Sequence, residues 1–179
     1  WAGGFGGLTR FDGKQFVNYS PKNGLIHHNI TALCGHDSGY VFAGTSGGLS
    51  IINGKSIRSF PSSGYFSGNQ ITVLAKGNSG KVYIGTVNGI YEYRNGNIRI
   101  LKGSSDKHIY ALSFNYNKLF AGTDSAMMIF SESEVTSIGS GNGLLAGNVT
   151  AISEFRGKMF IGTNAGLFVM ENGVSRLKA

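Results

Sequence analysis

Phe42-Ala-Gly-Thr-Ser-Gly-Gly-Leu49 is one of five versions of an eight-residue motif in this 179-residue chain. The other versions begin at Trp1, Tyr83, Phe120 and Phe160. Their first glycines are spaced by 41, 41, 37 and 40 residues along the chain. A period near 40 in a chain that holds 29 glycines is typical of four-stranded propeller blades rather than of helical repeats.

Residues 30–60 show how one repeat divides into four strands. Apolar runs at 30–34, 40–44 and 49–52 are followed by an alternating run at 56–60. Between the last two runs lies Asn53-Gly54, a strong hairpin signal, and the repeats predict the corresponding turn at Asn95-Gly96 and at Asn172-Gly173. The first two runs are apolar on both faces, which predicts inner strands, and the alternating fourth run predicts an outer strand with one wet face.

The repeats predict an all-β fold, a β-propeller of four-stranded antiparallel blades, over residues 1–179 as a single domain or a fragment of one. We predict four complete blades at 30–60, 71–101, 109–138 and 149–178, and a partial blade at 1–19. An open arc of blades exposes strand edges, which soluble proteins tolerate poorly. We therefore expect either that the chain is part of a longer propeller or that the arc closes with further blades of another chain.

Composition argues against several classes of function. The formal net charge is +7, but the basic residues are scattered singly, so we expect no nucleic-acid partner. Cys34 is the single cysteine and excludes an intramolecular disulfide. No apolar stretch reaches 18 residues, so we expect no membrane contact by this segment.

Residues that could carry catalysis or bind metal are few. His27-His28 is the only histidine pair, His36 and His108 stand alone, and no carboxylates accompany them at a workable spacing. We therefore expect no metal, no cofactor and no catalytic residue. The Gly-Thr pairs of the motif could form a ring of hydroxyls for a ligand, but we expect them to be structural, with glycine allowing close approach and threonine satisfying a turn.

Candidate ligand-binding residues lie in the loops that join the fourth strand of one blade to the first strand of the next. In a propeller these loops ring one end of a central channel, where ligands commonly bind. The candidates are amide, imidazole, aromatic and lysine side chains: His28, Asn29, Tyr65, Asn69, Gln70, Lys107, His108 and Asn148. Such a set suits sugar hydroxyls or an anionic oligosaccharide. The alternative is that Asn29 and Asn148 only cap the turn from loop to strand.

The motif, followed by an aromatic residue and Asp/Asn-Gly, resembles the two-component regulator propeller repeat. The upstream runs Asn23-Gly24-Leu25 and His28–Leu33 fit the same pattern, and the resemblance covers essentially the whole chain. Two departures are visible: the motif tryptophan is present only as Trp1, and Asp124–Met127 lacks the glycine and leucine of the pattern. The resemblance implies a periplasmic or extracellular ligand-binding domain of a bacterial membrane sensor, ahead of a histidine kinase or a diguanylate cyclase.

We therefore expect a non-catalytic, ligand-sensing propeller that recognises a small molecule or an oligosaccharide at its loop rim. A second hypothesis is a structural or adhesive propeller that assembles with other chains. A third is a propeller enzyme of the polysaccharide lyase type.

Overall fold

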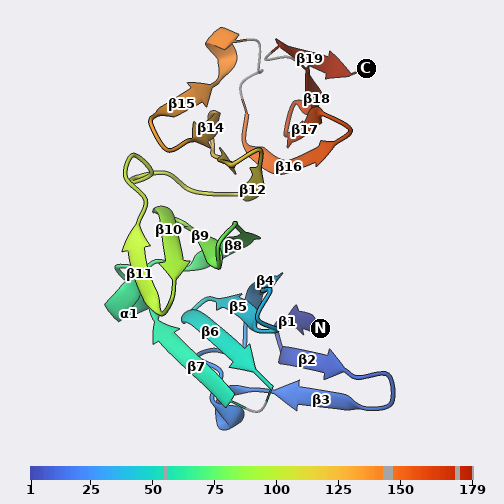
Figure 1. The fold of residues 1–179 in the computed structure, drawn as a ribbon, viewed down its shortest axis with the longest axis vertical. Helices are drawn as coiled ribbons and strands as arrows, with labels where there is room; N and C mark the ends of the chain where they lie inside the picture. Colours follow the sequence, from blue (N-terminus) through green and yellow to red (C-terminus); the bar gives the residue numbers. More distant parts are fainter. Residues whose placement is uncertain (55, 143–146, 172–173, 179) are drawn as a thin grey trace.

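The structure, a computed structural model, describes residues 1–54, 56–142, 147–171 and 174–178. Within these residues the strands form five antiparallel sheets in chain order (Figure 1). We call them the first to fifth sheets. The predicted turn at Asn172-Gly173 lies outside the described residues.

Each sheet is built from strands that are consecutive in the sequence. The first has three strands, β1 (Ala2–Gly4), β2 (Gly7–Phe11) and β3 (Phe16–Tyr19). The second has β4 (Ile30–Gly35), β5 (Val41–Thr45), β6 (Gly48–Asn53) and β7 (Ser56–Pro61). The third has β8 (Ile71–Lys76), β9 (Lys81–Thr86), β10 (Gly89–Arg94) and β11 (Asn97–Ile100). The fourth has β12 (Ala111–Asn115), β13 (Lys118–Gly122), β14 (Met127–Phe130) and β15 (Val135–Ile138). The fifth has β16 (Val149–Phe155), β17 (Lys158–Thr163), β18 (Gly166–Glu171) and β19 (Val174–Lys178).

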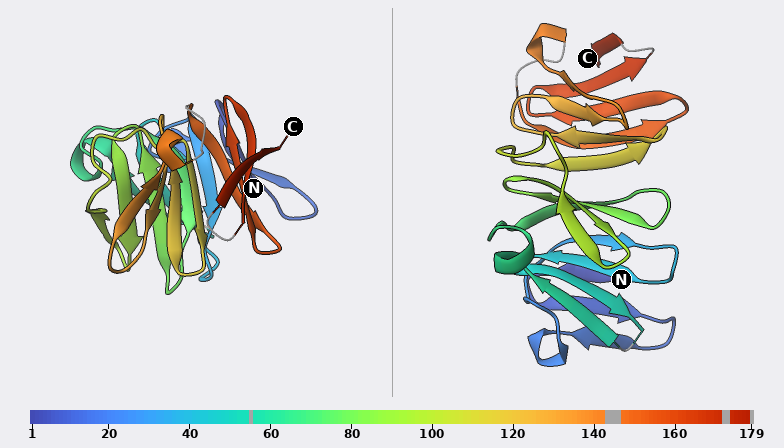
Figure 2. Two further views of the ribbon diagram at one scale, coloured as in Figure 1. Left: turned by 90° about the horizontal axis from the view of Figure 1, so that it is seen from above. Right: turned by 60° about the vertical axis from the view of Figure 1, so that its left-hand side comes forward.

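The sheets stack face to face in a row, with the first and fifth sheets at opposite ends (Figures 1 and 2). Their innermost strands contact one another in the order β1, β4, β8, β12, β16. Loops between sheets hold short helical turns at Pro21–Asn23, Ser62–Tyr65 (α1) and Ser140–Asn142. This arrangement is consistent with the predicted propeller.

The first strand is the innermost of its sheet, as predicted, but it is not the most buried strand. In the second sheet β5 is buried throughout and β6 is buried up to its last residue, whereas most of β4 is only half-buried. The central strands have a neighbour on either side within the sheet and are covered by adjacent sheets. The first strand instead forms the inner edge of its sheet and is less covered there. Strand β7 alternates between exposed and more buried residues, as predicted for an outer strand.

The fourth sheet begins two residues later than predicted, at Ala111 rather than at Ile109. The backbone N–H of Ile109 donates to Thr86 O of the third sheet at 3.0 Å. Val149 makes the same kind of bond to Thr123 O of the fourth sheet, at 2.8 Å. These N–H groups join neighbouring sheets, which a pattern within one repeat does not reveal.

The motif glycines allow neighbouring sheets to approach closely, as predicted. A Cβ added to Gly44 would lie 2.5 Å from Cγ2 of Ile71, the first residue of β8. A Cβ on Gly3 would lie 2.5 Å from Ile30 Cγ2, the corresponding atom of the second sheet. Because real Cβ atoms do not approach other carbons so closely, these positions require glycine. We call this contact the glycine joint.

The motif threonines are also structural, as predicted. Thr45 Oγ1 donates to Gly48 O at 2.8 Å, and Thr86 Oγ1 donates to Gly89 O at 2.9 Å. Thr163 makes the same contact with Gly166 O at 3.0 Å. Each hydroxyl therefore closes the turn in which it lies and does not belong to a ring of ligand contacts.

Candidate functional site

The row of sheets has two faces, distinguished by the connections that reach them. The loop face carries the loops between consecutive sheets and the turns between second and third strands. Backbone hydrogen bonds join these connections, from Ser46 N to Asn29 O at 3.3 Å and from Val87 N to Gln70 O at 3.2 Å. The turn face carries the remaining turns, such as those at residues 77–80 and 95–96. The predicted ligand-binding residues belong to the loop face.

Two of the predicted side chains bind the protein itself: Asn29 reaches the turn between β5 and β6, and Asn69 binds its own loop. Asn29 Nδ2 donates to Ser46 Oγ at 2.8 Å, and Asn69 Nδ2 donates to Phe66 O at 2.8 Å. This bond of Asn29 goes to another turn and not to the turn from its own loop to β4, so the capping alternative stays a prediction for Asn29. For Asn148, whose carbonyl accepts from Asn164 N at 3.3 Å, a capping role of the side chain stays a prediction.

The ring-bearing candidates pack on neighbouring rings. His28 stacks on His27 with 4.4 Å between ring centroids, and His108 stacks on Tyr110 at 4.1 Å. Tyr65 lies edge-on to Phe60 and remains 45% exposed. Phe66, which the sequence places beside Tyr65 in the rim loop, is instead fully buried in the core.

Gln70 and Lys107 complete the set as exposed side chains. Among the described residues, no hydrogen bond or ring contact joins a predicted residue of one intersheet loop to a predicted residue of another. The structure therefore places the eight residues on one face and spreads them along the row. Their role in ligand binding stays a prediction.

In residues 1–54, 56–142, 147–171 and 174–178, no three His, Cys, Asp or Glu side chains form a group that could hold a metal ion. None of the helices in these ranges is long and apolar enough to cross a membrane.

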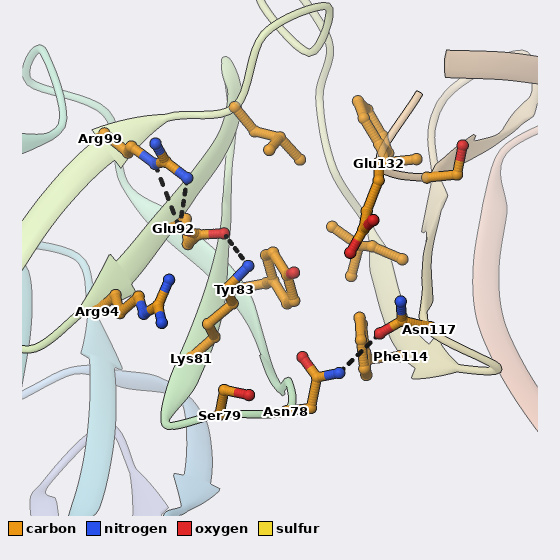
Figure 3. Close-up of a pocket in the computed structure, with 14 residues that line it drawn as sticks. Asn78, Ser79, Lys81, Tyr83, Glu92, Arg94, Arg99, Phe114, Asn117 and Glu132 are labelled. Atoms are coloured by element: carbon orange, nitrogen blue, oxygen red, sulfur yellow. Dashed lines mark hydrogen bonds and ion pairs between the residues drawn. The ribbon is translucent and has the colours of Figure 1, made fainter. Parts of the chain in front are cut away.

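A groove of about 450 Å³ opens on the turn face, between the third and fourth sheets (Figure 3). Its third-sheet wall carries Lys81, Glu92 and Arg99, and its fourth-sheet wall carries Phe114 and Glu132. We call it the intersheet groove. No sequence prediction pointed to this face.

Glu92, on β10, is the buried charge of the intersheet groove, with only 3% of the residue exposed. Its carboxylate accepts from Arg99 Nη2 at 2.9 Å and from Arg99 Nε at 3.2 Å, and Lys81 Nζ lies 3.2 Å from its other oxygen. A carboxylate removed from water needs such partners, because an unpaired buried charge is costly.

The internal repeats show that Glu92 departs from the pattern of three of the other sheets. Glu92 pairs with Arg99 of the outer strand. The residues that make the equivalent pair in the second, fourth and fifth sheets are Ile51, Ile129 and Val169. These three residues are apolar, whereas the first sheet has the charged Arg10 at the equivalent position on β2. Aligning the repeats position by position would therefore have revealed Glu92 from the sequence.

Tyr83 is a second departure at the same place. Of the other four motif copies, three have phenylalanine at this position (Phe42, Phe120 and Phe160) and one has Trp1, so Tyr83 adds a hydroxyl to the groove. Its ring stacks on Phe114 with 5.5 Å between centroids. Burial, and next the charge of Glu92, raise the pKa of Tyr83, so the hydroxyl keeps its proton and can donate.

The mouth of the groove is polar. Asn78 Nδ2 donates to Asn117 Oδ1 at 2.7 Å, which bridges the turns of the third and fourth sheets. Arg94 lies beside Lys81, and Glu132 points into the groove from the opposite wall (Figure 3). Within the part of the chain that the structure describes, Arg94 forms no ion pair. The groove can therefore offer both cationic donors and a carboxylate to a small polar molecule.

No protein-family model matches the chain, and no curated protein sequence matches it. Solved structures do resemble it. The extracellular domain of BT4673 from B. thetaiotaomicron, described as a one component system, matches 99% of this chain with a TM-score of 0.75 and 15% identity. The extracellular domain of BT3049 from the same organism, described as a hybrid two component system, matches 90% with a TM-score of 0.74 and 19% identity.

A third similar structure is an inactive variant of virginiamycin B lyase from Staphylococcus aureus, which matches 82% of this chain with a TM-score of 0.66 and 13% identity. The match takes in 54% of the lyase but only 26% and 24% of the two sensor chains. This chain thus spans about a quarter of the sensor domains that it resembles. At these identities the likenesses establish the fold alone, which is all-β and propeller-like.

Proposed function

We propose that the chain is a non-catalytic, ligand-recognising part of an extracytoplasmic bacterial sensor, in the periplasm or outside the cell. The likeness of its fold to extracellular domains of sensor systems supports this proposal. The ligand would bind at the loop face, and its class would be a glycan or an anionic oligosaccharide. Amide, imidazole and ammonium groups at the predicted positions can donate to sugar hydroxyls and to sulfate or carboxylate groups.

One observation carries the proposal: the loop backbones are fixed while side chains on them remain exposed. Gln70 O is bound to the neighbouring turn, and Lys107 O accepts from Gly89 N at 2.8 Å, yet both side chains face solvent. Exposed polar side chains on a fixed backbone are preorganised for binding, because little conformational entropy remains to be lost.

Calorimetry against neutral and sulfated oligosaccharides tests the proposal. We expect Gln70→Ala and His108→Ala to weaken binding by about tenfold each, the effect of one or two lost hydrogen bonds. Gln15→Ala, an exposed glutamine outside the loop-face set, is the matched control and should bind like the parent. No heat of binding for the parent, or parent-like binding by both loop variants, would reject the proposal. Release of cleaved product from polysaccharide would instead indicate a lyase.

A second candidate function, assembly with other blades or another chain, is favoured by the fifth sheet. Leu167 is 44% exposed, whereas its motif counterparts Leu8, Leu49 and Ile90 are at most 1% exposed because a neighbouring sheet covers them. The same surface on the fifth sheet would therefore gain about 25 cal/mol for each Å² of apolar area covered by a further sheet. Light scattering at increasing concentration, with Leu167→Ser as comparison, should show self-association that the variant reduces. A parent protein that stays monomeric throughout would argue against assembly between copies of this chain.

A further inference from the structure

We infer that the intersheet groove is a second ligand site, which binds a small organic monoanion with several hydroxyl groups, such as a uronic acid. It lies on the turn face, opposite the loop face that carries the proposed function. The inference therefore goes beyond that function and stands or falls separately from it.

The first argument is that the polar groups of the groove are not needed to join the sheets. At the equivalent place between the second and third sheets, the contact is made by Phe42 and Ile51, and both are buried in one apolar cluster. Tyr83 and Glu92 replace these residues between the third and fourth sheets. Replacing an apolar contact with a buried ion pair usually adds no stability. Polar residues that break a local pattern without stabilising the fold are expected at functional sites.

The second argument is the charge of the groove. Lys81, Arg94 and Arg99 face two carboxylates, Glu92 and Glu132, so one positive charge remains. Glu92 already holds Lys81 and the Nε edge of Arg99. Arg94 has no ion-pair partner among the described residues and can therefore bind a carboxylate through two parallel N–H groups. A single residual charge suits a monoanion better than a phosphate dianion.

The third argument is the remaining lining, which suits a hydroxylated ring. The protonated hydroxyl of Tyr83 can donate, and Glu132 can accept from ligand hydroxyls. Leu101 and Phe130 supply apolar wall for the carbon face of the ring. A volume of about 450 Å³ falls in the range of small-molecule sites and admits a sugar acid with water around it.

In this site Glu92 is a positioning residue. It contacts no ligand in our assignment, but its carboxylate fixes the Lys81 ammonium and the Arg99 guanidinium on the wall beside Arg94. Cations held in place in this way lose little freedom when an anion binds.

Titration of the full chain with galacturonate, followed by NMR or calorimetry, tests the assignment. We expect shifts confined to signals of the third and fourth sheets, and no shifts with galactose, which lacks the carboxylate. Arg94→Asn takes the residue found at the matching position of the second sheet, Asn53, and should weaken binding at least tenfold. Arg156→Asn removes an arginine from a turn of the fifth sheet on the same face and should bind like the parent.

Two further variants separate ligand contact from positioning. Tyr83→Phe should fold like the parent and bind several-fold more weakly, because it loses one donor. Glu92→Ile restores the residue type of the second, fourth and fifth sheets and should lose binding while staying folded. Three results would overturn the assignment. The parent protein could bind galactose as tightly as galacturonate, it could bind inorganic phosphate as tightly as galacturonate, or Arg94→Asn could bind galacturonate like the parent. Gln70→Ala changes the loop face and leaves the groove intact, so this variant should still bind galacturonate in the groove. Loss of binding at the loop face can therefore be told apart from loss of binding in the groove.

Discussion

Glu92 occupies a surface that the second, fourth and fifth sheets fill with isoleucine or valine, and it is tolerated there because three N–H donors face its carboxylate. Both of its partners are accessible to solvent: the Lys81 side chain is partly exposed and the Arg99 side chain is largely exposed. If the carboxylate is removed, both cations can turn outward and regain hydration. The stability cost of losing Glu92 therefore depends mainly on what fills its space.

We predict that two substitutions of this residue differ in their effect on stability. Glu92→Ala should lower the free energy of unfolding by about 2–3 kcal/mol, because it leaves a cavity where the buried side chain was. Glu92→Ile should change it by less than about 1 kcal/mol, or raise it, because it rebuilds an apolar joint. Urea unfolding measures both. Equal destabilisation by the two variants would mean that the ion pairs themselves stabilise the fold.

Cys34 gives a prediction about pH. Burial raises the pKa of its thiol above the usual 9.0, and the nearby charge of Lys76 opposes this only in part. Since the thiolate is the reactive form, modification at pH 8 should be slower in the folded protein than in urea. The rate should rise with a midpoint above pH 9.0. Because the thiol has the lower pKa in the unfolded chain, the unfolded chain loses this proton at a lower pH than the folded protein does. The free energy of unfolding should therefore fall as the pH rises through this range. A midpoint at or below that of a small thiol would contradict the assignment of burial as the main cause.

At the scale of the strand and turn, much of the fold could be predicted, because its signals are local. Apolar runs and hairpin residues place β5, β6 and β7 within one or two residues of their observed bounds. Asn95-Gly96, predicted as a hairpin turn, has the two positive φ values, 50° and 87°, that such a turn requires. What could not be predicted depends on neighbouring sheets: the later start of β12 and the half-buried state of β4.

The candidate sites divide in the same way. The loop-face residues were identifiable from their place just before a strand. The intersheet groove was not, because it joins side chains of β9, β10, β11 and β12 that lie far apart in the sequence. Its signal is the replacement of an apolar residue by Glu92, which is visible only when the copies are aligned and compared column by column.

The glycine joint gives a prediction with a matched control in the same sheet. Gly44→Ala would place a Cβ 2.5 Å from Ile71 Cγ2 and should destabilise the protein by about 1–3 kcal/mol through overpacking. Gly35→Ala, at the end of β4, meets no atom within 4 Å and should change stability by no more than about 0.5 kcal/mol. Thermal unfolding of the two variants compares them directly. Equal melting temperatures would show that the sheets can move apart at this joint without cost.

Across the whole molecule, neighbouring sheets are tied at the inner strands and again on the turn face. Lys76 binds Asp37, Asn78 binds Asn117, and the Tyr116 hydroxyl donates to Glu154 at 2.9 Å. Each tie joins one sheet to the next. The molecule is therefore a linear array in which stability comes from each sheet and from its contacts with its neighbours.

Hydrogen exchange should reveal this array as a gradient along the row. Backbone amides of β5 and β9 lie in sheets covered on both faces and should exchange most slowly. Amides of β2 and β18, in the first and fifth sheets, should exchange at least about tenfold faster, because those sheets have a single neighbour in the row. Mass spectrometry of the 179-residue chain can resolve these segments. Uniform protection from the first sheet to the fifth would show that the row opens only as one unit.

The glycine joint also bears on how such a chain can change length. Each joint pairs a glycine from one copy with a β-branched residue from the next, as Gly3 meets Ile30 and Gly44 meets Ile71. If one whole repeat is duplicated or deleted in the gene, every motif glycine still faces a β-branched residue of the next sheet. If only part of a repeat is duplicated or deleted, a residue with a side chain would stand where the glycine is needed, and the two side chains would clash. Blade number is thus free to drift by whole repeats without any new contact having to evolve.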